Sequence, residues 1–111
     1  MYDNVLEFKK EKVIKELIPI GYWYSEREPE FPMPTSADEF EHKDEVIEYL
    51  NNGEVRHRWR GMSSCRLCDL RHNGSRCLTD RKYIWPEGLA HYVEEHNTPL
   101  PEEFIKYILE N

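Results

Sequence analysis

The segment Cys65-Arg66-Leu67-Cys68 is followed, at residues 85–96, by Trp-Pro-Glu-Gly-Leu-Ala-His-Tyr-Val-Glu-Glu-His, which contains His91 and His96. Two thiols in a CxxC turn followed by two imidazoles are the ligand order of a tetrahedral zinc site. The 22 residues between Cys68 and His91 exceed the roughly 12 of a DNA-reading finger and leave room for a loop and a hairpin. We therefore predict one zinc ion bound by Cys65, Cys68, His91 and His96.

The spacing of the two histidines sets a condition on their helix. Five residues turn an ideal helix by about 500°, which leaves the two side chains about 140° apart. His96 is therefore expected where the helix loosens, and Asn97 and Pro99 supply that loosening.

Other interpretations of these residues stay open. Cys77 lies in a strand-like run and is interpreted as a small buried apolar residue, and His72 as an exposed loop residue, but either could replace a ligand, with His96 the one displaced. The cysteine pair could be a redox site, although loop-like sequence follows it where a thioredoxin-type motif begins a helix. His91 and His96 could also be ordinary surface or core histidines.

Four protein ligands leave no coordination position for water, so the predicted zinc is structural rather than catalytic. The chain has no HExxH motif, no glycine-rich phosphate loop and no serine nucleophile elbow. We expect that the protein is not an enzyme. A zinc enzyme with an open site would require one of the four ligands to be spurious.

The composition indicates one domain over residues 1–111. The chain is 39% hydrophobic and 33% charged, so a structural metal would add needed stability. Three cysteines fit metal binding in a reducing compartment better than a disulfide framework. No segment has the composition of a signal peptide or a membrane span, so we expect a cytoplasmic protein without a membrane partner.

Hydrophobic periodicity predicts an α+β fold. Residues 4–18 are expected to form a helix ended by Pro19, and a proline-rich connector covers 19–35. Ser36 and Glu39 have the form of a capping box for a second helix ending at residues 51–53. The remaining expected elements are a strand over 55–60, a hairpin with strands near 76–79 and 82–85, a helix from Pro86 to Asn97 and a helix over 101–108.

These elements divide the predicted domain into two parts. Residues 1–53 form a helical N-terminal part, and residues 54–111 form a zinc-binding ββα-like part followed by a C-terminal helix. We expect a small zinc-stabilised domain with a CxxC knuckle, a short antiparallel sheet and a helix that carries both histidines, flanked by N-terminal and C-terminal helices.

The net charge of −7 is unevenly distributed. Residues 54–82 contain eight basic and three acidic residues, a local net charge of +5, which leaves −12 for the remainder. In the strand over 55–60, Val55, His57 and Trp59 alternate with arginines, which predicts one apolar face and one arginine face. The candidate nucleic-acid contacts in this basic strip are Arg56, Arg58, Arg60, Arg66, Arg71, Arg76 and Arg81.

The CxxC pair, the Leu78-Thr79-Asp80 run, the block from Tyr83 to His96 and Leu100-Pro101 resemble a family of small, functionally uncharacterised bacterial proteins. That family carries a CxxCG turn and a block of the form LTDG…WPEGLxHYVxxH…LP. The resemblance covers a little over half of the chain and implies the same four zinc ligands, with Cys77 at a variable strand position. Asp69 and Arg81 stand where the family has glycine. The resemblance implies no activity.

Three functions remain. The first is a zinc-stabilised accessory module that binds another protein through aromatic residues of the connector, namely Tyr22, Trp23, Tyr24 and Phe31. The alternative is nucleic-acid binding through the arginine-rich 56–82 segment, with Trp59 or Tyr83 available for stacking. The acidic remainder and Glu87, Glu94 and Glu95 on the histidine helix count against it. The third is the zinc enzyme.

Overall fold

The structure is a computed structural model, and it describes residues 17–59 and 61–111. Its sheet has the strand order β1-β4-β3-β2. The strands are β1 at Ile18–Pro19, β2 at Glu54–Arg58, β3 at Arg76–Thr79 and β4 at Tyr83–Pro86. β3 runs antiparallel to both β2 and β4, whereas β1 pairs with β4 in parallel. The predicted hairpin is confirmed, with its second strand shifted by one residue.

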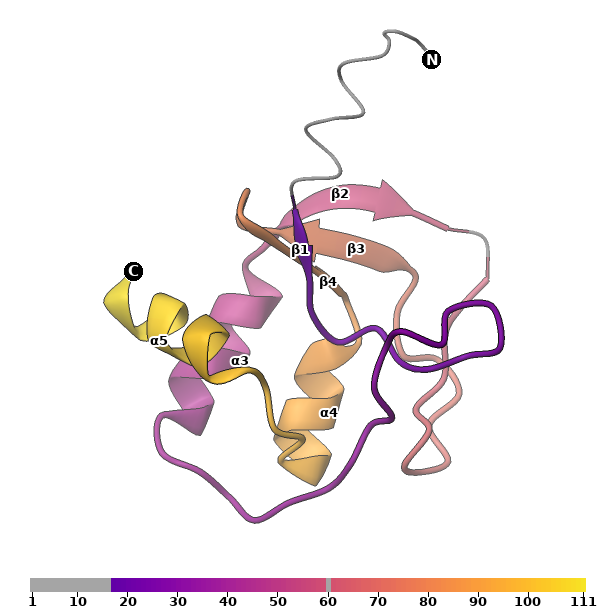
Figure 1. Cartoon of the computed structure of the whole chain (residues 1–111), viewed down its shortest axis with the longest axis horizontal. Helices are drawn as coiled ribbons and strands as arrows, with labels where there is room; N and C mark the ends of the chain where they lie inside the picture. Colours follow the sequence, from indigo (N-terminus) through magenta and orange to yellow (C-terminus); the bar gives the residue numbers. More distant parts are fainter. Residues whose placement is uncertain (1–16, 60) are drawn as a thin grey trace, which may run out of the picture.

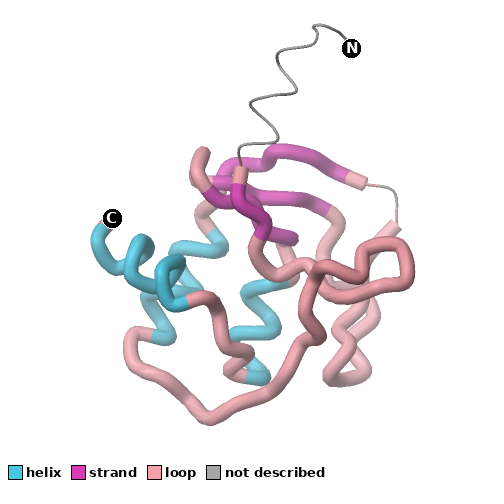
Figure 2. Tube along the Cα trace, in the orientation of Figure 1, coloured by secondary structure: helices cyan, strands magenta, loops and turns pink. Residues whose placement is uncertain are grey.

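Three helices of the described chain lie on one side of this sheet (Figures 1 and 2). They are α3 at Lys43–Asn51, α4 at Leu89–His96 and α5 at Glu102–Glu110, and α3 packs against both of the others. The indole N–H of Trp85 donates to the carbonyl of Leu50 at 3.1 Å, which ties β4 to α3. The expected α+β fold is confirmed. Its fully buried apolar side chains are Val46, Leu50, Trp85, Leu89, Val93 and Phe104.

The connector covers the opposite side of β3. Residues on a strand point alternately to the two faces, so Cys77 faces away from Leu78 and from the helices. The hydroxyl of Tyr22 donates to Cys77 Sγ at 3.0 Å, and the Tyr22 ring packs on Phe31 with centroids 5.9 Å apart. Burial by this cover raises the pKa of Cys77 and that of Tyr22. These two aromatic side chains thus cover the sheet.

The predicted N-terminal elements need correction. Most of the helix expected over 4–18 lies outside the described residues, but its last residue, Ile18, belongs to β1. The helix expected from Ser36 begins only at Lys43, after His42 with a positive φ of 64°. The backbone of Ala37 is used elsewhere, because its N–H donates to the His96 carbonyl and its carbonyl accepts from Asn97 Nδ2. Tertiary contacts with the end of α4 therefore replace the capping box.

The prediction of an apolar and an arginine face on β2 is wrong. Every residue of β2 is exposed, and the register shifts between Val55, which pairs with Leu78, and His57, which pairs with Cys77. Because neighbouring residues of β3 point to opposite faces, Val55 and His57 do so too, with Arg56 as the extra residue of a bulge. An edge strand with a bulge does not keep the period-two pattern.

The ends of the remaining elements follow local chemistry. The β3–β4 turn contains Arg81 with φ 79° and is closed by the Asp80 carboxylate, which accepts the N–H groups of Lys82 and Tyr83. Pro86 ends β4 instead of opening α4, which begins at Leu89. The C-terminal helix is confirmed as α5. None of the helices in residues 17–59 and 61–111 is long and apolar enough to cross a membrane.

Candidate metal centre

The knuckle loop, residues 61–75, continues the β2–β3 pair beyond its ends. The N–H of Trp59 donates to the Ser75 carbonyl at 2.9 Å, and that of Asn73 to the Ser63 carbonyl at 2.8 Å. The turn closes where the N–H of Cys65 donates to the Leu70 carbonyl at 3.0 Å. This ladder presents Cys65 and Cys68 from one tight turn.

The backbone of the knuckle also directs a donor at one of the sulfurs. The N–H of Leu67 points at Cys65 Sγ with a separation of 3.3 Å, and a charged acceptor strengthens such a bond. Asp69 is not among the described non-glycine residues with positive φ. The turn therefore does not need the glycine that the resemblance places there.

The two histidines come from α4. His96 is its last residue, and the left-handed turn follows at Asn97, with φ 52°. The helix therefore remains intact through His96 and ends immediately after it, as an asparagine C-cap allows. The imidazole rings lie close together, with centroids 5.3 Å apart and an interplanar angle of 78°. Both rings direct Nε2 toward a cysteine.

The four side chains converge on one point. One ligand atom from each of Cys65, Cys68, His91 and His96 lies within 4.8 Å of all the others. Cys65 Sγ is 3.5 Å from His96 Nε2, and Cys68 Sγ is 3.3 Å from His91 Nε2. Zinc bonds of about 2.3 Å to sulfur and 2.0–2.1 Å to nitrogen give a tetrahedral S···N edge of about 3.5 Å. The group has the size of a four-coordinate metal site.

The two cysteines differ in exposure. Cys65 is buried, with 6% of its surface exposed, whereas Cys68 is exposed, so the site opens to solvent on the Cys68 side. Burial, and then the neighbouring His96, lower the pKa of His91. Both effects favour the neutral imidazole, which is the form that binds a metal.

Two residues that the sequence analysis did not single out set the distance between the knuckle and α4. Gly88 precedes the helix, and a Cβ placed on it would lie 2.2 Å from the backbone oxygen of Asn73 and 2.5 Å from its side chain. Asn73 is buried and donates from Nδ2 to the Gly88 carbonyl at 3.3 Å. A glycine in the first turn of the helix predicted from Pro86 was the only sequence signal for this close approach.

The alternative ligands lie apart from this group. Cys77 is buried beneath Tyr22, and His72 is exposed on the knuckle loop, and neither belongs to the group of four. Their positions agree with the interpretation of Cys77 as a small buried residue and of His72 as a loop residue.

The structure divides the candidate nucleic-acid arginines into different environments. Arg76 pairs with Glu87 at 2.7 Å, and Arg81 pairs with Glu54 at 2.9 Å. Arg56, Arg58 and Arg71 are exposed and have no carboxylate partner among residues 17–59 and 61–111. Arg66 donates to the Tyr24 carbonyl. Arg60 lies outside the described residues.

Of the aromatic residues expected to stack on bases, only Trp59 is accessible. Tyr83 is 4% exposed and packs on Phe104 with ring centroids 4.5 Å apart. Tyr83 therefore belongs to the core. Trp59, in contrast, is half-buried and lines a cavity beside the knuckle.

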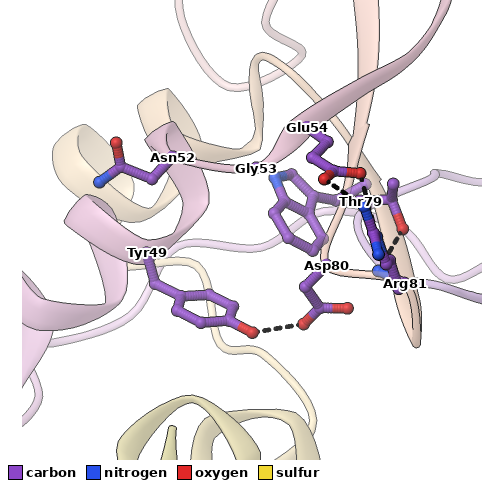
Figure 3. A pocket seen from close by; sticks show the side chains of 8 residues that line it. Tyr49, Asn52, Gly53, Glu54, Thr79, Asp80 and Arg81 are labelled. Carbon is purple, nitrogen blue, oxygen red and sulfur yellow. Dashed lines mark hydrogen bonds and ion pairs between the residues drawn. The ribbon is translucent and has the colours of Figure 1, made fainter.

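A small cavity of about 180 Å³ lies between the end of α3 and the β3–β4 turn. Figure 3 shows Tyr49 donating to Asp80 there, and Arg81 reaching Glu54. Burial, and then the bond to Asp80, raise the pKa of Tyr49. Several polar groups of this cavity bond to one another, and none of the candidate metal ligands lines it.

Comparisons with protein-family models, curated proteins and solved structures found no significant match to this chain. The resemblance to the bacterial LTDG…WPEGLxHYVxxH proteins accordingly stays a prediction. The residues themselves support a candidate centre of two thiols and two imidazoles that could hold a metal ion.

Proposed function

We propose that this protein is a non-catalytic binding module whose second half is held together by one structural zinc ion. The observation that supports this most is the convergence of Cys65, Cys68, His91 and His96, whose ligand atoms lie within 4.8 Å of one another. The cysteines come from a hydrogen-bonded knuckle and the histidines from a helix. A metal at this point joins two segments that are far apart in the sequence.

The donor set favours zinc. Two thiolates and two imidazoles are borderline-soft ligands, and zinc accepts a tetrahedral arrangement of them without an electronic preference for another geometry. Calcium and magnesium require oxygen ligands, and this group offers none. Each histidine Nε2 is already 3.3–3.5 Å from a cysteine sulfur, so the metal would need little rearrangement.

The ligand count supports a structural role. Catalytic zinc keeps a position for water or substrate, whereas four protein side chains complete the tetrahedron. An enzyme would require one ligand to stay unbound. Cys68, the exposed ligand, would be the residue to leave, but its sulfur is 3.3 Å from His91 Nε2. We therefore propose a closed site.

A module of this kind acts through the surface that the metal holds in place. A protein partner remains our first expectation for the connector side of the molecule, where Tyr24 is 40% exposed and Met33 58%. Arginines without a carboxylate partner favour an anionic partner, and this second candidate is developed below.

Metal analysis tests the proposal. We expect one zinc ion per chain after purification under reducing conditions, and cobalt substitution should give the strong visible absorption of tetrahedral cobalt bound to thiolates. Cys68→Ser should abolish stoichiometric binding. Cys77→Ser is the matched control, because it makes the same chemical change at a cysteine outside the group, and it should retain the ion.

Two outcomes would contradict the proposal. The first is wild-type protein that stays folded and binds neither zinc nor cobalt. The second is a cobalt spectrum of five- or six-coordinate metal, which would indicate an open site and favour the enzyme.

A further inference from the structure

A cavity of about 300 Å³ adjoins the candidate metal centre. Figure 1 shows the two segments that enclose it, the connector after β1 and the loop after β2, side by side at the right of the molecule. Its volume is at the lower end of the range for small-ligand sites. The main side chains that line it are Tyr22, Trp23, Trp59, Arg66, Pro86 and Tyr92.

The walls of this aromatic cavity are fixed before any ligand binds. Trp23 packs edge-on against Tyr92, with ring centroids 5.3 Å apart, and the Tyr92 hydroxyl accepts the N–H of Arg66 at 2.9 Å. The Arg66 guanidinium donates to the Tyr24 carbonyl at 2.6 Å. Because these flat rings are already held in place, a ligand that binds between them loses little free energy in ordering the side chains of the site.

One polar group in the wall lacks a partner. The indole N–H of Trp23 is buried and has no acceptor among the described residues. This nitrogen has almost no surface open to the cavity, so a ligand would meet the flat ring of Trp23 rather than its N–H. An aromatic ring such as a nucleobase has the flat shape that stacks against these rings.

The charges around the cavity favour a polyanion. The two arginines paired with glutamate, Arg76 and Arg81, are in or beside the β3–β4 hairpin. Of the arginines without a carboxylate partner in the described chain, Arg27 lies among the glutamates of the connector, and the other four lie on β2 and on the knuckle loop, on both sides of Trp59 along the sequence. Removing the paired charges thus leaves positive charge concentrated near the aromatic cavity. The four arginines on β2 and the knuckle loop are Arg56, Arg58, Arg66 and Arg71.

We propose that the aromatic cavity binds a base of a single-stranded nucleic acid, while Arg58 and Arg66 contact its phosphates. Aromatic platforms beside exposed arginines are the usual means of binding single strands, because every base has a face that can stack. A duplex does not present an unstacked base. The helix nearest the cavity, α4, carries Glu94 and Glu95 on its exposed surface and cannot read a groove.

The acidic residues restrict the path of the strand. The tip of the connector carries Glu26, Glu28 and Glu30, which repel phosphate. The acidic first turns of α3 and α5 lie on the opposite side of the molecule from the knuckle (Figure 1). The phosphates are therefore expected along β2. The proposal rests on the structural zinc in one respect, since the knuckle that carries Arg66 is held by that ion.

The test uses the zinc-loaded full chain and three probes: a ten-residue oligothymidylate, a ten-residue oligouridylate and an abasic oligomer of the same length. Tryptophan fluorescence reports binding, because two of the three tryptophans, Trp23 and Trp59, line the cavity. We expect both base-containing strands to bind at least about tenfold more tightly than the abasic one, since stacking on an aromatic ring typically contributes about 5- to 150-fold.

Variants locate the site. Trp59→Leu keeps an apolar side chain but removes the stacking surface, and should weaken binding of the oligothymidylate by about 5- to 150-fold. Arg58→Gln should reduce the dependence of log K on log salt by about 0.7, the value for one phosphate contact on a single strand. Arg81→Gln is the matched control, because it removes the same charge from an arginine paired with Glu54, and should bind as wild type.

Equal binding of the abasic and base-containing strands would overturn the proposal, as would equal losses in Arg58→Gln and Arg81→Gln. If protein that contains one zinc ion does not bind these strands at low salt, the proposal is also overturned. That result would leave the proposed structural zinc unaffected and would point to a protein partner. Oligothymidylate binding by protein without zinc would instead contradict the proposed structural role of the metal, whereas the proposed base-binding site would stand.

Discussion

Gly88→Ala tests whether the close approach of α4 to the knuckle sets the geometry of the metal centre. Gly88 has φ −77° and ψ −2°, which alanine adopts without strain, so the backbone itself opposes the change very little. The new Cβ would lie 2.2 Å from the Asn73 oxygen. Ordinary contact begins near 3.4 Å, so the two segments must move apart by about 1.2 Å.

A movement of that size exceeds what the site tolerates. Metal–ligand distances are held within about 0.2 Å, and Asn73 and Gly88 lie on the two segments that carry the cysteines and the histidines respectively. We expect zinc affinity to fall by about 10- to 100-fold, as for loss of other groups that orient ligands. Overpacking should lower the free energy of unfolding by about 1–3 kcal/mol.

Competition with a chromophoric chelator measures the affinity, and thermal unfolding measures the stability. Gly61→Ala is the control, since its Cβ would have no neighbour within 4 Å but its φ of 76° strains alanine. It should cost about 1 kcal/mol of stability and leave zinc affinity unchanged. A Gly88→Ala protein with wild-type zinc affinity and melting temperature would refute the reasoning.

Three further predictions concern metal, pH and strain. Removing zinc with a chelator should lower the melting temperature by more than 10 °C, because structural zinc stabilises small domains by on the order of 10 kcal/mol; an unchanged melting temperature by circular dichroism would show that the ion is not structural. The pKa of His91 is lowered in the folded state. The neutral imidazole therefore contributes to the stability of the metal-free protein above pH 6.5, the ordinary pKa of histidine, and this contribution is lost as pH falls through the folded pKa. Zinc affinity should also fall as the pH is lowered, and an affinity that stays constant between about pH 7.5 and 5.5 would contradict this. Arg81→Gly should raise the free energy of unfolding by about 1 kcal/mol, because φ 79° suits glycine and the lost ion pair with Glu54 is largely exposed; a lower melting temperature would mean that the ion pair outweighs the strain.

The elements best predicted from the sequence are those whose signals are local. The strands around residues 76–86 and the C-terminal helix were found within one or two residues of their expected bounds. A predicted helix boundary failed where distant residues competed for the same backbone groups. Ser36 and Glu39 have the sequence of a capping box, but Ala37 bonds to the end of α4 instead, and α3 begins at Lys43.

The arginine strip illustrates a second limit. Alternation along β2 predicted a continuous arginine face, but the bulge at Arg56 breaks the alternation. Which arginines have partners depends on strand pairing, since Glu54 on β2 reaches Arg81 in the β3–β4 turn, and Glu87, just after β4, reaches Arg76 on the neighbouring strand β3. Composition alone gives the total charge of this segment and says nothing about these pairs.

The sequence by itself determined the candidate ligands, because a CxxC turn and two histidines on one short helix present their side chains through local geometry. Only the tertiary structure decided how far apart these two pairs lie. That distance depends on the contact of Gly88 with Asn73, on the ladder that closes the knuckle and on the core beneath Trp85. The aromatic cavity likewise required the connector to fold back over the sheet. Contacts between residues remote in sequence depend on packing, which no local pattern encodes.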